Sequence, residues 1–505
     1  MLAPQADISD AERERGLQRL VIEALFSNTT AALTTGVVLT AFAIHLGANN
    51  STIGLLAALP FLTQLAQLPA IALIERLRQR KRIAVLSSVF GRLMLGVMAL
   101  APFAGSLALP GLVTATLVLC ALGAVGGCAW NSWMRDLAPE DRMGRIFARR
   151  TFYATITSLL AGLGAALALE WTPERSQARD LAFAGLYAAG CAAGLYSAWI
   201  VARMPEPRMP DVDRRATHLL AQLRRPLGDL NFRRLILFLG TWQFAINFAT
   251  PFFTVYLVRQ LGYDMTVVMG LSIASQIANA VALRNWGTLA DRYANKSVLL
   301  VAAPLYIVCI AGMAGGSQIA DPAMRLAWLG ALHLFMGAAV AGVTLATANI
   351  ALKLSPRGEA ASYLAASAVV TALAAGSAPI AGGLLADFFA VRRLELVGRW
   401  TDPEGVFTYL SLALSNWDFY FLLSAVLGLY ALHRLGHVEE AGEIGRQEML
   451  RQVVKETRGS IHNFSTVTGL KALTEFPSNL VREMQVRQRY RQIHRKRDEG
   501  RSRSG

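Results

Sequence analysis

Three ionisable side chains lie inside long apolar stretches of this chain, and each could carry chemistry there. Arg92, Glu23 and His333 are flanked by runs of small and aliphatic residues. A charged side chain near the centre of a bilayer costs at least about 2.5–3.5 kcal/mol, so it needs a partner or a cavity. Arg92 is the most central of the three. Its guanidinium either binds a carboxylate or phosphate bidentately or bonds to backbone carbonyls of a neighbouring helix.

Glu23 and His333 are the candidates for carrying a proton. Burial in an apolar setting makes a carboxyl group bind its proton more tightly, and histidine titrates near neutral pH. Each has a plainer alternative. Glu23 would be interfacial if its apolar segment began later, and His333 would be an interior histidine whose hydrogen bonds are satisfied.

Uncharged polar and aromatic residues in the same stretches could line a site for a small solute. Such sites have mostly apolar walls with a few aimed polar groups. Besides Arg92, the predicted substrate-binding residues are Gln64, Trp130, Asn131, Gln243, Asn247 and Gln276. Trp130 belongs to the densest cluster, although a tryptophan near the end of a span also serves as an interfacial anchor.

The sequence lacks the motifs of soluble hydrolases and of ATP-driven pumps. It contains no G-x-x-x-x-G-K-[ST], no H-E-x-x-H and no G-x-S-x-G. The four cysteines fall inside apolar segments, with no C-x-x-C and no metal-ligand spacing. We therefore expect neither an enzyme nor a cofactor or metal site.

Twelve apolar segments must position these residues, and each is long enough to cross a bilayer, which takes about 20 residues. Of 505 residues, 54% are apolar and only 16% are charged, whereas about 25% charge is usual in soluble proteins. The first six predicted spans are Leu20–Leu46, Thr52–Ile74, Ile83–Ala104, Leu109–Trp133, Thr151–Glu170 and Leu181–Ala202. The second six are Phe232–Tyr256, Met265–Arg284, Val298–Gly316, Leu326–Leu352, Ala360–Leu385 and Trp417–Leu432.

Positive charge alternates between the loops, which predicts the orientation of the chain. All six lysines lie in loops or tails of the same parity, together with the arginine-rich segments 75–82 and 135–150. Lys and Arg near the ends of spans are retained on the cytoplasmic side. We expect a bacterial inner-membrane protein with both termini in the cytoplasm. Its net charge of +15 would then face anionic lipid rather than nucleic acid.

The two sets of six spans resemble each other in the same direction along the chain. Glu75-Arg76 after the second span matches Asp291-Arg292 after the eighth, at an offset of 216 residues. We predict an all-α polytopic membrane protein with twelve transmembrane helices in two pseudo-symmetric six-helix bundles. Its expected parts are the N-terminus 1–19, the bundles 20–202 and 232–434, the central loop 203–231, and the basic tail 435–505. The tail either meets anionic lipid or binds a partner.

The segment Gly287–Lys296 carries the most specific motif. It resembles the loop signature G-x-L-a-D-r-x-G-r-k of the major facilitator superfamily, although Ala294 and Asn295 depart from it. The first half holds a degraded copy in which Ile71 replaces the glycine. In that family the loop acts as a cytoplasmic latch, and the alternative is an ordinary charged loop. The resemblance assigns the gating role to Gly287, Asp291, Arg292, Glu75 and Arg76.

The resemblance implies a secondary transporter that moves a small organic solute by alternating access. Proton coupling is a hypothesis that rests on Glu23 and His333, and uniport stays open. An anionic or amphipathic substrate is a hypothesis that rests on Arg92 alone. The competing hypothesis is a receptor or membrane-complex assembly factor of the same fold that acts through its C-terminal tail and transports nothing.

Overall fold

The computed structural model describes residues 4–5, 8–137, 143–173, 176–209, 225–356, 360–402, 405–415 and 417–465. Twelve helical segments in this part of the chain are long and apolar enough to cross a membrane. This confirms the predicted number of spans. Much of the predicted central loop and basic tail, residues 210–224 and 466–505, lies outside the described residues.

The first six spans form one bundle. The first span is α1 (Asp10–Thr34) followed by α2 (Val37–His45), and the second is α3 (Asn50–Leu62), the short 3-10 turn η1 (Thr63–Ala66) and α4 (Gln67–Leu77). The next four spans are α5 (Arg80–Ala99), α6 (Ala108–Leu137), α7 (Met143–Glu170) and α8 (Gln177–Ala202). Within the bundle, α5 packs on α6 and α8, and α1 packs on α7 and α8.

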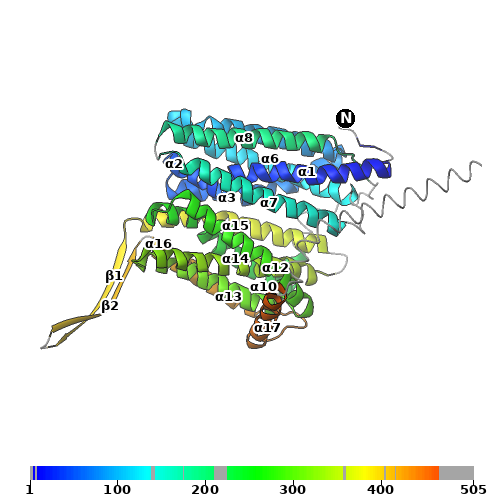
Figure 1. The fold of residues 1–505 in the computed structure, drawn as a ribbon. Helices are drawn as coiled ribbons and strands as arrows, with labels where there is room; N and C mark the ends of the chain where they lie inside the picture. The colour runs from blue at the N-terminus through cyan, green and yellow to red at the C-terminus, as the bar shows by residue number, and fades with distance from the viewer. Residues whose placement is uncertain are drawn as a thin grey trace, which may run out of the picture.

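The second six spans form an equivalent bundle. The seventh span is α10 (Leu230–Ala249), η5 (Thr250–Phe252), α11 (Phe253–Val255) and the π-helical turn η6 (Tyr256–Gln260). The remaining spans are α12 (Met265–Arg292), α13 (Asn295–Ala314), α14 (Pro322–Lys353), α15 (Ala360–Phe389) and α16 (Trp417–Gly436). Helix α10 packs on α15 and α16, and α13 packs on α14 and α16. Figure 1 shows the bundles as two layers, joined mainly by α3 along α15 and by α7 against α12.

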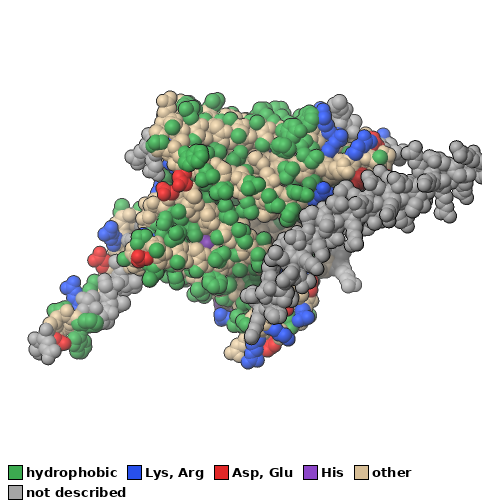
Figure 2. Space-filling model, viewed as in Figure 1, with side chains coloured by type: hydrophobic (Ala, Val, Ile, Leu, Met, Phe, Trp, Pro, Cys, Tyr) green, Lys and Arg blue, Asp and Glu red, His purple; other side chains and the backbone are tan. Residues whose placement is uncertain are grey.

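Large apolar side chains on the flanks of both bundles face outward. Leu160, Val308 and Leu384 are each at least 60% exposed, and Figure 2 shows hydrophobic side chains over much of the visible flank. Such exposure is unfavourable in water but natural in lipid, where helices satisfy their own backbone hydrogen bonds. The surface therefore agrees with the twelve-span assignment.

The two ends of the helices carry different features, and we name the sides after them. On the termini side lie the N-terminus and α17 (Arg446–Ser465), which packs on α12 and α13. On the hairpin side, a β-hairpin of β1 (Arg393–Asp402) and β2 (Gly405–Ser415) projects away from the bundles (Figure 1).

The hairpin is an addition to the predicted all-α architecture. Its strands pair antiparallel, and the register shifts between Gly398 and Arg399. Beyond the shift, Trp400 pairs with Phe407, a kind of cross-strand aromatic pair that stabilises hairpins. A search for apolar segments of about 20 residues finds only an insertion here, because each strand is too short to be detected by it.

Candidate functional site

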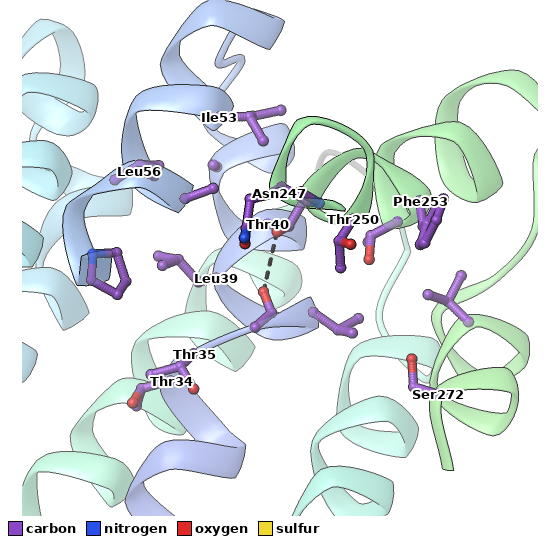
Figure 3. Close-up of a pocket in the computed structure, with 18 of the residues that line it drawn as sticks. Thr34, Thr35, Leu39, Thr40, Ile53, Leu56, Asn247, Thr250, Phe253 and Ser272 are labelled. Atoms are coloured by element: carbon purple, nitrogen blue, oxygen red, sulfur yellow. Dashed lines mark hydrogen bonds between the residues drawn. The ribbon is translucent and has the colours of Figure 1, made fainter. Parts of the chain in front are cut away.

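A cavity of about 510 Å³ lies between the two bundles, toward the hairpin side. In the first bundle its walls come from α1, α2, α3, α5 and α6, and in the second from α10, α11, α12, α13 and α14. Figure 3 shows lining side chains such as Thr40, Asn247 and Thr250 converging on this space from both bundles. The volume lies within the range of about 300–1,000 Å³ that is common for small-molecule sites.

Two helix breaks border the cavity, one in each bundle. The first span breaks at Gly36, whose φ of 59° and ψ of −124° favour glycine over a residue with a side chain. The seventh span breaks at the 3-10 turn that contains Pro251. Irregular backbone within a membrane is tolerated where it lines a cavity, and it offers polar groups to a ligand there.

The polar groups that line the cavity are uncharged. Hydroxyl groups dominate, accompanied by two side-chain amides and one imidazole. These residues are Thr34, Thr35, Thr40, Thr116, Thr250, Thr254, Ser272, Ser275, Tyr306, Asn247, Gln276 and His333. No Asp, Glu, Lys or Arg lines the cavity in the described part of the chain. A charged ligand would find no counter-ion, whereas a ligand rich in hydroxyl or amide groups could exchange its hydrogen bonds with water for bonds to these walls.

Several of these polar side chains are held in place by neighbours. Asn247 donates through Nδ2 to the Gln243 backbone oxygen at 2.8 Å and to Gln243 Oε1 at 3.2 Å. Thr250 Oγ1 lies 3.2 Å from the Tyr306 hydroxyl and 2.9 Å from the Ile246 carbonyl oxygen. The site is thus partly organised without a ligand, which reduces the entropy lost on binding.

Of the residues predicted to bind substrate or carry protons, Asn247, Gln276 and His333 line the cavity. Gln243 supports Asn247 from one turn away. Gln64 and Asn131 are exposed and do not belong to the lining. Gln64 instead donates to the Pro60 carbonyl at 3.2 Å and accepts a hydrogen bond from Gln67.

Glu23, Arg92 and Trp130 meet in a different place, inside the first bundle. Glu23, which is only 7% exposed, accepts hydrogen bonds from Arg150 at 3.3 Å and from Ser197 at 3.2 Å. The Arg150 guanidinium in turn lies 5.0 Å from the centre of the Trp130 ring. Glu23 therefore holds a buried ion pair between α1 and α7.

Arg92 packs between α5 and α8 beside this ion pair. A side chain at Gly194 would meet it, because an added Cβ would lie 2.6 Å from Arg92 Cδ. Glu23 attracts its guanidinium electrostatically, but the buried Nε has no hydrogen-bond partner in the part of the chain that the structure describes. The side chain does not line the cavity between the bundles.

A hydrogen-bonded clasp joins the two bundles on the hairpin side. Asp387 at the end of α15 accepts from the Asn50 and Ser51 amides at 3.2 and 3.0 Å and from the Ser51 hydroxyl at 2.5 Å. Arg259 donates to Asn50 Oδ1 at 3.0 Å and to the Ala48 carbonyl at 2.5 Å. A carboxylate at a helix N-terminus is well placed to stabilise α3. These five residues form the hairpin-side clasp, which joins the two bundles on that side of the cavity.

Comparison with known sequences identifies the family. No curated protein sequence matches the chain. The profile of the Major Facilitator Superfamily, however, matches residues 23–379. The chain belongs to the major facilitator superfamily.

Solved structures of transporters from this superfamily have the same fold. A variant of the nucleoside transporter NupG is 12% identical, with a TM-score of 0.64, and the match covers 84% of this chain and all of that one. The inward-open xylose transporter XylE from E. coli is 14% identical, with a TM-score of 0.59 over 86% and 98% of the two chains. An inward-facing bacterial homolog of the human lysosomal transporter Spinster is 17% identical, with a TM-score of 0.55 over 90% and 97%. At these identities the likeness shows the shared fold.

The family's loop signature lies on the termini side and is not engaged between the bundles. Asp291, Arg292, Glu75 and Arg76 are all exposed, and none of them forms an ion pair within the described part of the chain. Gly287 has open space where a Cβ would lie. The gating role that the resemblance assigns to these residues stays a prediction for another conformation.

Sequence reasoning missed the charged residues of the clasp and the hydroxyl-bearing residues that line the cavity of this superfamily member. Arg259 and Asp387 lie at the ends of spans, where charged residues are common. The lining threonines and serines also gave no signal, because such residues are frequent in membrane helices and pack there. A search for hydroxyl groups near predicted helix breaks, such as Gly36 and Pro251, would have found part of this set.

Proposed function

We propose that the protein is a secondary transporter that moves a small, uncharged, hydroxyl-bearing solute by alternating access. The observation that carries this proposal is the cavity between the bundles, whose described lining is rich in hydroxyl groups and lacks charge. This departs from the anionic substrate suggested by Arg92, since that side chain lies outside the lining. Sugars and nucleosides have the chemistry that such walls would recognise.

The arrangement of gates supports an alternating-access cycle. The hairpin-side clasp is formed while the signature residues on the termini side are exposed. This is the pattern of a state closed on the hairpin side. Transport would require Asp387 to release α3 and the signature loop around Asp291 to engage, so that the cavity opens on the hairpin side and closes on the termini side.

Proton coupling would pass through Glu23. Its carboxylate is buried and shared between Arg150 and Ser197. Protonation would remove the charge that holds Arg150, which gives a physical link between a proton and the packing of α7 on α1. His333 lines the cavity and could respond to the same proton gradient.

The proposed setting is a bacterial inner membrane with the termini side in the cytoplasm. Its support is the concentration of Lys and Arg in the loops of that side. There the basic segments would face anionic lipid. Accessibility of single cysteines at Trp400 and Val454, labelled from outside intact cells, would test the orientation: only Trp400→Cys should react.

The direct test of function is thermal unfolding of the detergent-purified protein with D-xylose, uridine and, as a charged comparison, sodium lactate. A ligand that binds only the folded state stabilises it by about 2.7 kcal/mol at a hundredfold excess over Kd. We expect stabilisation by D-xylose or uridine and none by lactate. Counterflow of the stabilising solute in proteoliposomes would then establish transport.

Two matched variants tie the binding to the cavity. Asn247→Leu removes an amide from the lining, whereas Gln64→Leu removes an exposed amide outside it. The first should abolish the stabilisation and the second should keep it. Stabilisation by lactate alone, or equal losses in both variants, would contradict the proposal.

A further inference from the structure

One hydrogen bond determines which nitrogen of His333 carries the proton in the neutral ring. His333 Nδ1 lies 2.8 Å from the backbone oxygen of Leu329, one turn earlier in α14. A carbonyl oxygen can only accept. Nδ1 must therefore be the protonated nitrogen, and Nε2 keeps a free lone pair, because a neutral imidazole has one donor and one acceptor.

The acceptor nitrogen is available to a ligand. His333 lines the cavity. Within the described part of the chain its Nε2 forms no hydrogen bond, and it is not one of the fully buried polar atoms that lack a partner. The nearby hydroxyls and amides can each donate as well as accept. Nε2 of His333 differs from these groups because in the neutral ring it can only accept a hydrogen bond.

We propose that Nε2 of His333 is the specificity-determining acceptor of this cavity, which selects uncharged solutes carrying a hydroxyl or N–H donor at the matching position. The assignment rests on the proposed function and deepens it. A solute whose donor is replaced by a methyl ether would leave this nitrogen desolvated and unpaired, at the cost of a lost hydrogen bond.

Protonation would reverse the preference of the site. A doubly protonated ring donates from both nitrogens, so it would repel the donor that the neutral ring accepts. Helices α12 and α13 pack on α14, and the only titratable group that they contribute to the described lining is the Tyr306 phenol; across the cavity α6 adds the Cys120 thiol. Phenols and thiols ordinarily titrate well above pH 7. A loss of binding at low pH that is present in wild type and absent from His333→Gln would therefore report on His333.

Two substitutions separate the acceptor from the rest of the ring. The oxygen of His333→Gln can occupy the place of Nε2, whereas the side chain of His333→Asn reaches only the place of Nδ1. We would measure Kd for D-xylose, for uridine and for their O-methylated derivatives by calorimetry, with wild type and both variants. For the unmethylated solute that binds, His333→Asn should weaken affinity about tenfold, as for one lost hydrogen bond, while His333→Gln should stay within about threefold.

The remaining outcomes each decide the matter. The tenfold loss should vanish for the methylated derivative, and the decline in wild-type affinity toward pH 5 should vanish in His333→Gln. Equal losses in both variants, or nitrogen NMR shifts that place the proton on Nε2, would overturn the assignment while leaving transport intact. If neither D-xylose nor uridine binds the wild-type protein, the proposed function fails and the assignment falls with it.

Discussion

On the termini side, the segment that follows the last span of each bundle meets the start of that bundle's third helix, and we call each meeting point a corner. The two corners have equivalent positions in the bundles but different hydrogen bonds and ion pairs. In each half, a glutamate that follows the last span faces the start of the third helix: Glu206 faces α5, and Glu440 faces α13. Both side chains are fully buried. What differs is the set of groups that meets each carboxylate.

In the second corner Glu440 is fully bonded. Its oxygens accept from the Asn295 amide at 3.2 Å, from Asn295 Nδ2 at 3.0 Å and from the Lys296 amide at 2.7 Å. Lys353 at the end of α14 adds an ion pair at 2.9 Å. The carboxylate thus caps α13, and although burial raises its pKa, these hydrogen bonds prevail and the pKa of Glu440 lies below its ordinary value.

In the first corner Glu206 is left with weaker contacts. Its Oε1 lies 3.6 Å from Arg80 Nε, and among the described residues neither oxygen has a partner in hydrogen-bond geometry. Arg80 instead donates to Asp136 at 2.5 Å and to the Pro207 carbonyl at 2.9 Å. Burial therefore prevails over the attraction of the nearby Lys81 and Arg80 amides, and it raises the pKa of Glu206.

The difference follows from one exchange of charge between the halves. Asp136 and Lys353 are 217 residues apart, the same offset, within one residue, as the signature loops. An acid at this position draws Arg80 away from Glu206, whereas a base at this position adds a bond to Glu440. The base therefore pairs with the aspartate in the first half, Arg80 with Asp136, and with the glutamate in the second half, Lys353 with Glu440.

The largest expected effect is on Glu440. Glu440→Ala would leave the Asn295 and Lys296 amides unpaired, and we expect a loss of about 3 kcal/mol in unfolding free energy, because each buried unsatisfied group costs about 1–3 kcal/mol. Glu206→Ala should cost about 1 kcal/mol or less, since Arg80 keeps its other acceptors. Denaturant unfolding in detergent measures both, and equal losses would remove the asymmetry.

The partner residues should show the opposite order. Asp136→Asn weakens a charged hydrogen bond to the buried Arg80 guanidinium, and we expect a loss of about 1–2 kcal/mol, reduced because the Asp136 side chain is 35% exposed. Lys353→Met should cost less than about 1 kcal/mol, because Lys353 is 48% exposed. A larger loss for Lys353→Met than for Asp136→Asn would mean that the ion pairs, rather than the backbone amides, hold the second corner.

The two glutamates should also give opposite pH dependences. The folded state binds fewer protons than the unfolded state at Glu440, so its contribution is complete above the ordinary value of 4.5 and is lost as the pH falls through the lowered pKa. At Glu206 the folded state binds more protons, so its contribution is complete below 4.5 and is lost as the pH rises through the raised pKa.

Unfolding free energies measured between pH 3 and 7 would test these signs. Glu440→Gln should remove a rise in stability with pH below about 4.5, and Glu206→Gln should remove a fall in stability above it. The same slope in both variants would show that the two corners are electrostatically alike.

The sequence was informative about the spans and less so about the contacts between them. Apolar length and the loop signature were enough to predict twelve spans and the family, because both are local along the chain. Asn247, Gln276 and His333 were found because polar residues within spans are rare. Whether they bind substrate stays a prediction.

Contacts between distant segments escaped this kind of argument. Asp387 meets Asn50 across 337 residues, and nothing local to either one specifies how the bundles touch. Arg92 was placed correctly within a span, but the depth of a residue does not fix the direction in which its side chain faces. Glu206 and Glu440 were passed over because a glutamate just beyond a span is usually solvated.

The smallest effect on stability is expected at the signature loops. There the two halves should differ in transport rather than in unfolding free energy. Asp291→Asn and Glu75→Gln change exposed side chains that form no ion pair in the described part of the chain, so each should shift unfolding free energy by less than about 0.5 kcal/mol. If the second loop is the latch and the first is only its degraded copy, Asp291→Asn should still lower counterflow severalfold while Glu75→Gln does not. Equal counterflow in both variants would mean that the latch is shared by the two halves or absent. The hydrogen bonds of Glu440 would then hold α13 in place without gating the cavity.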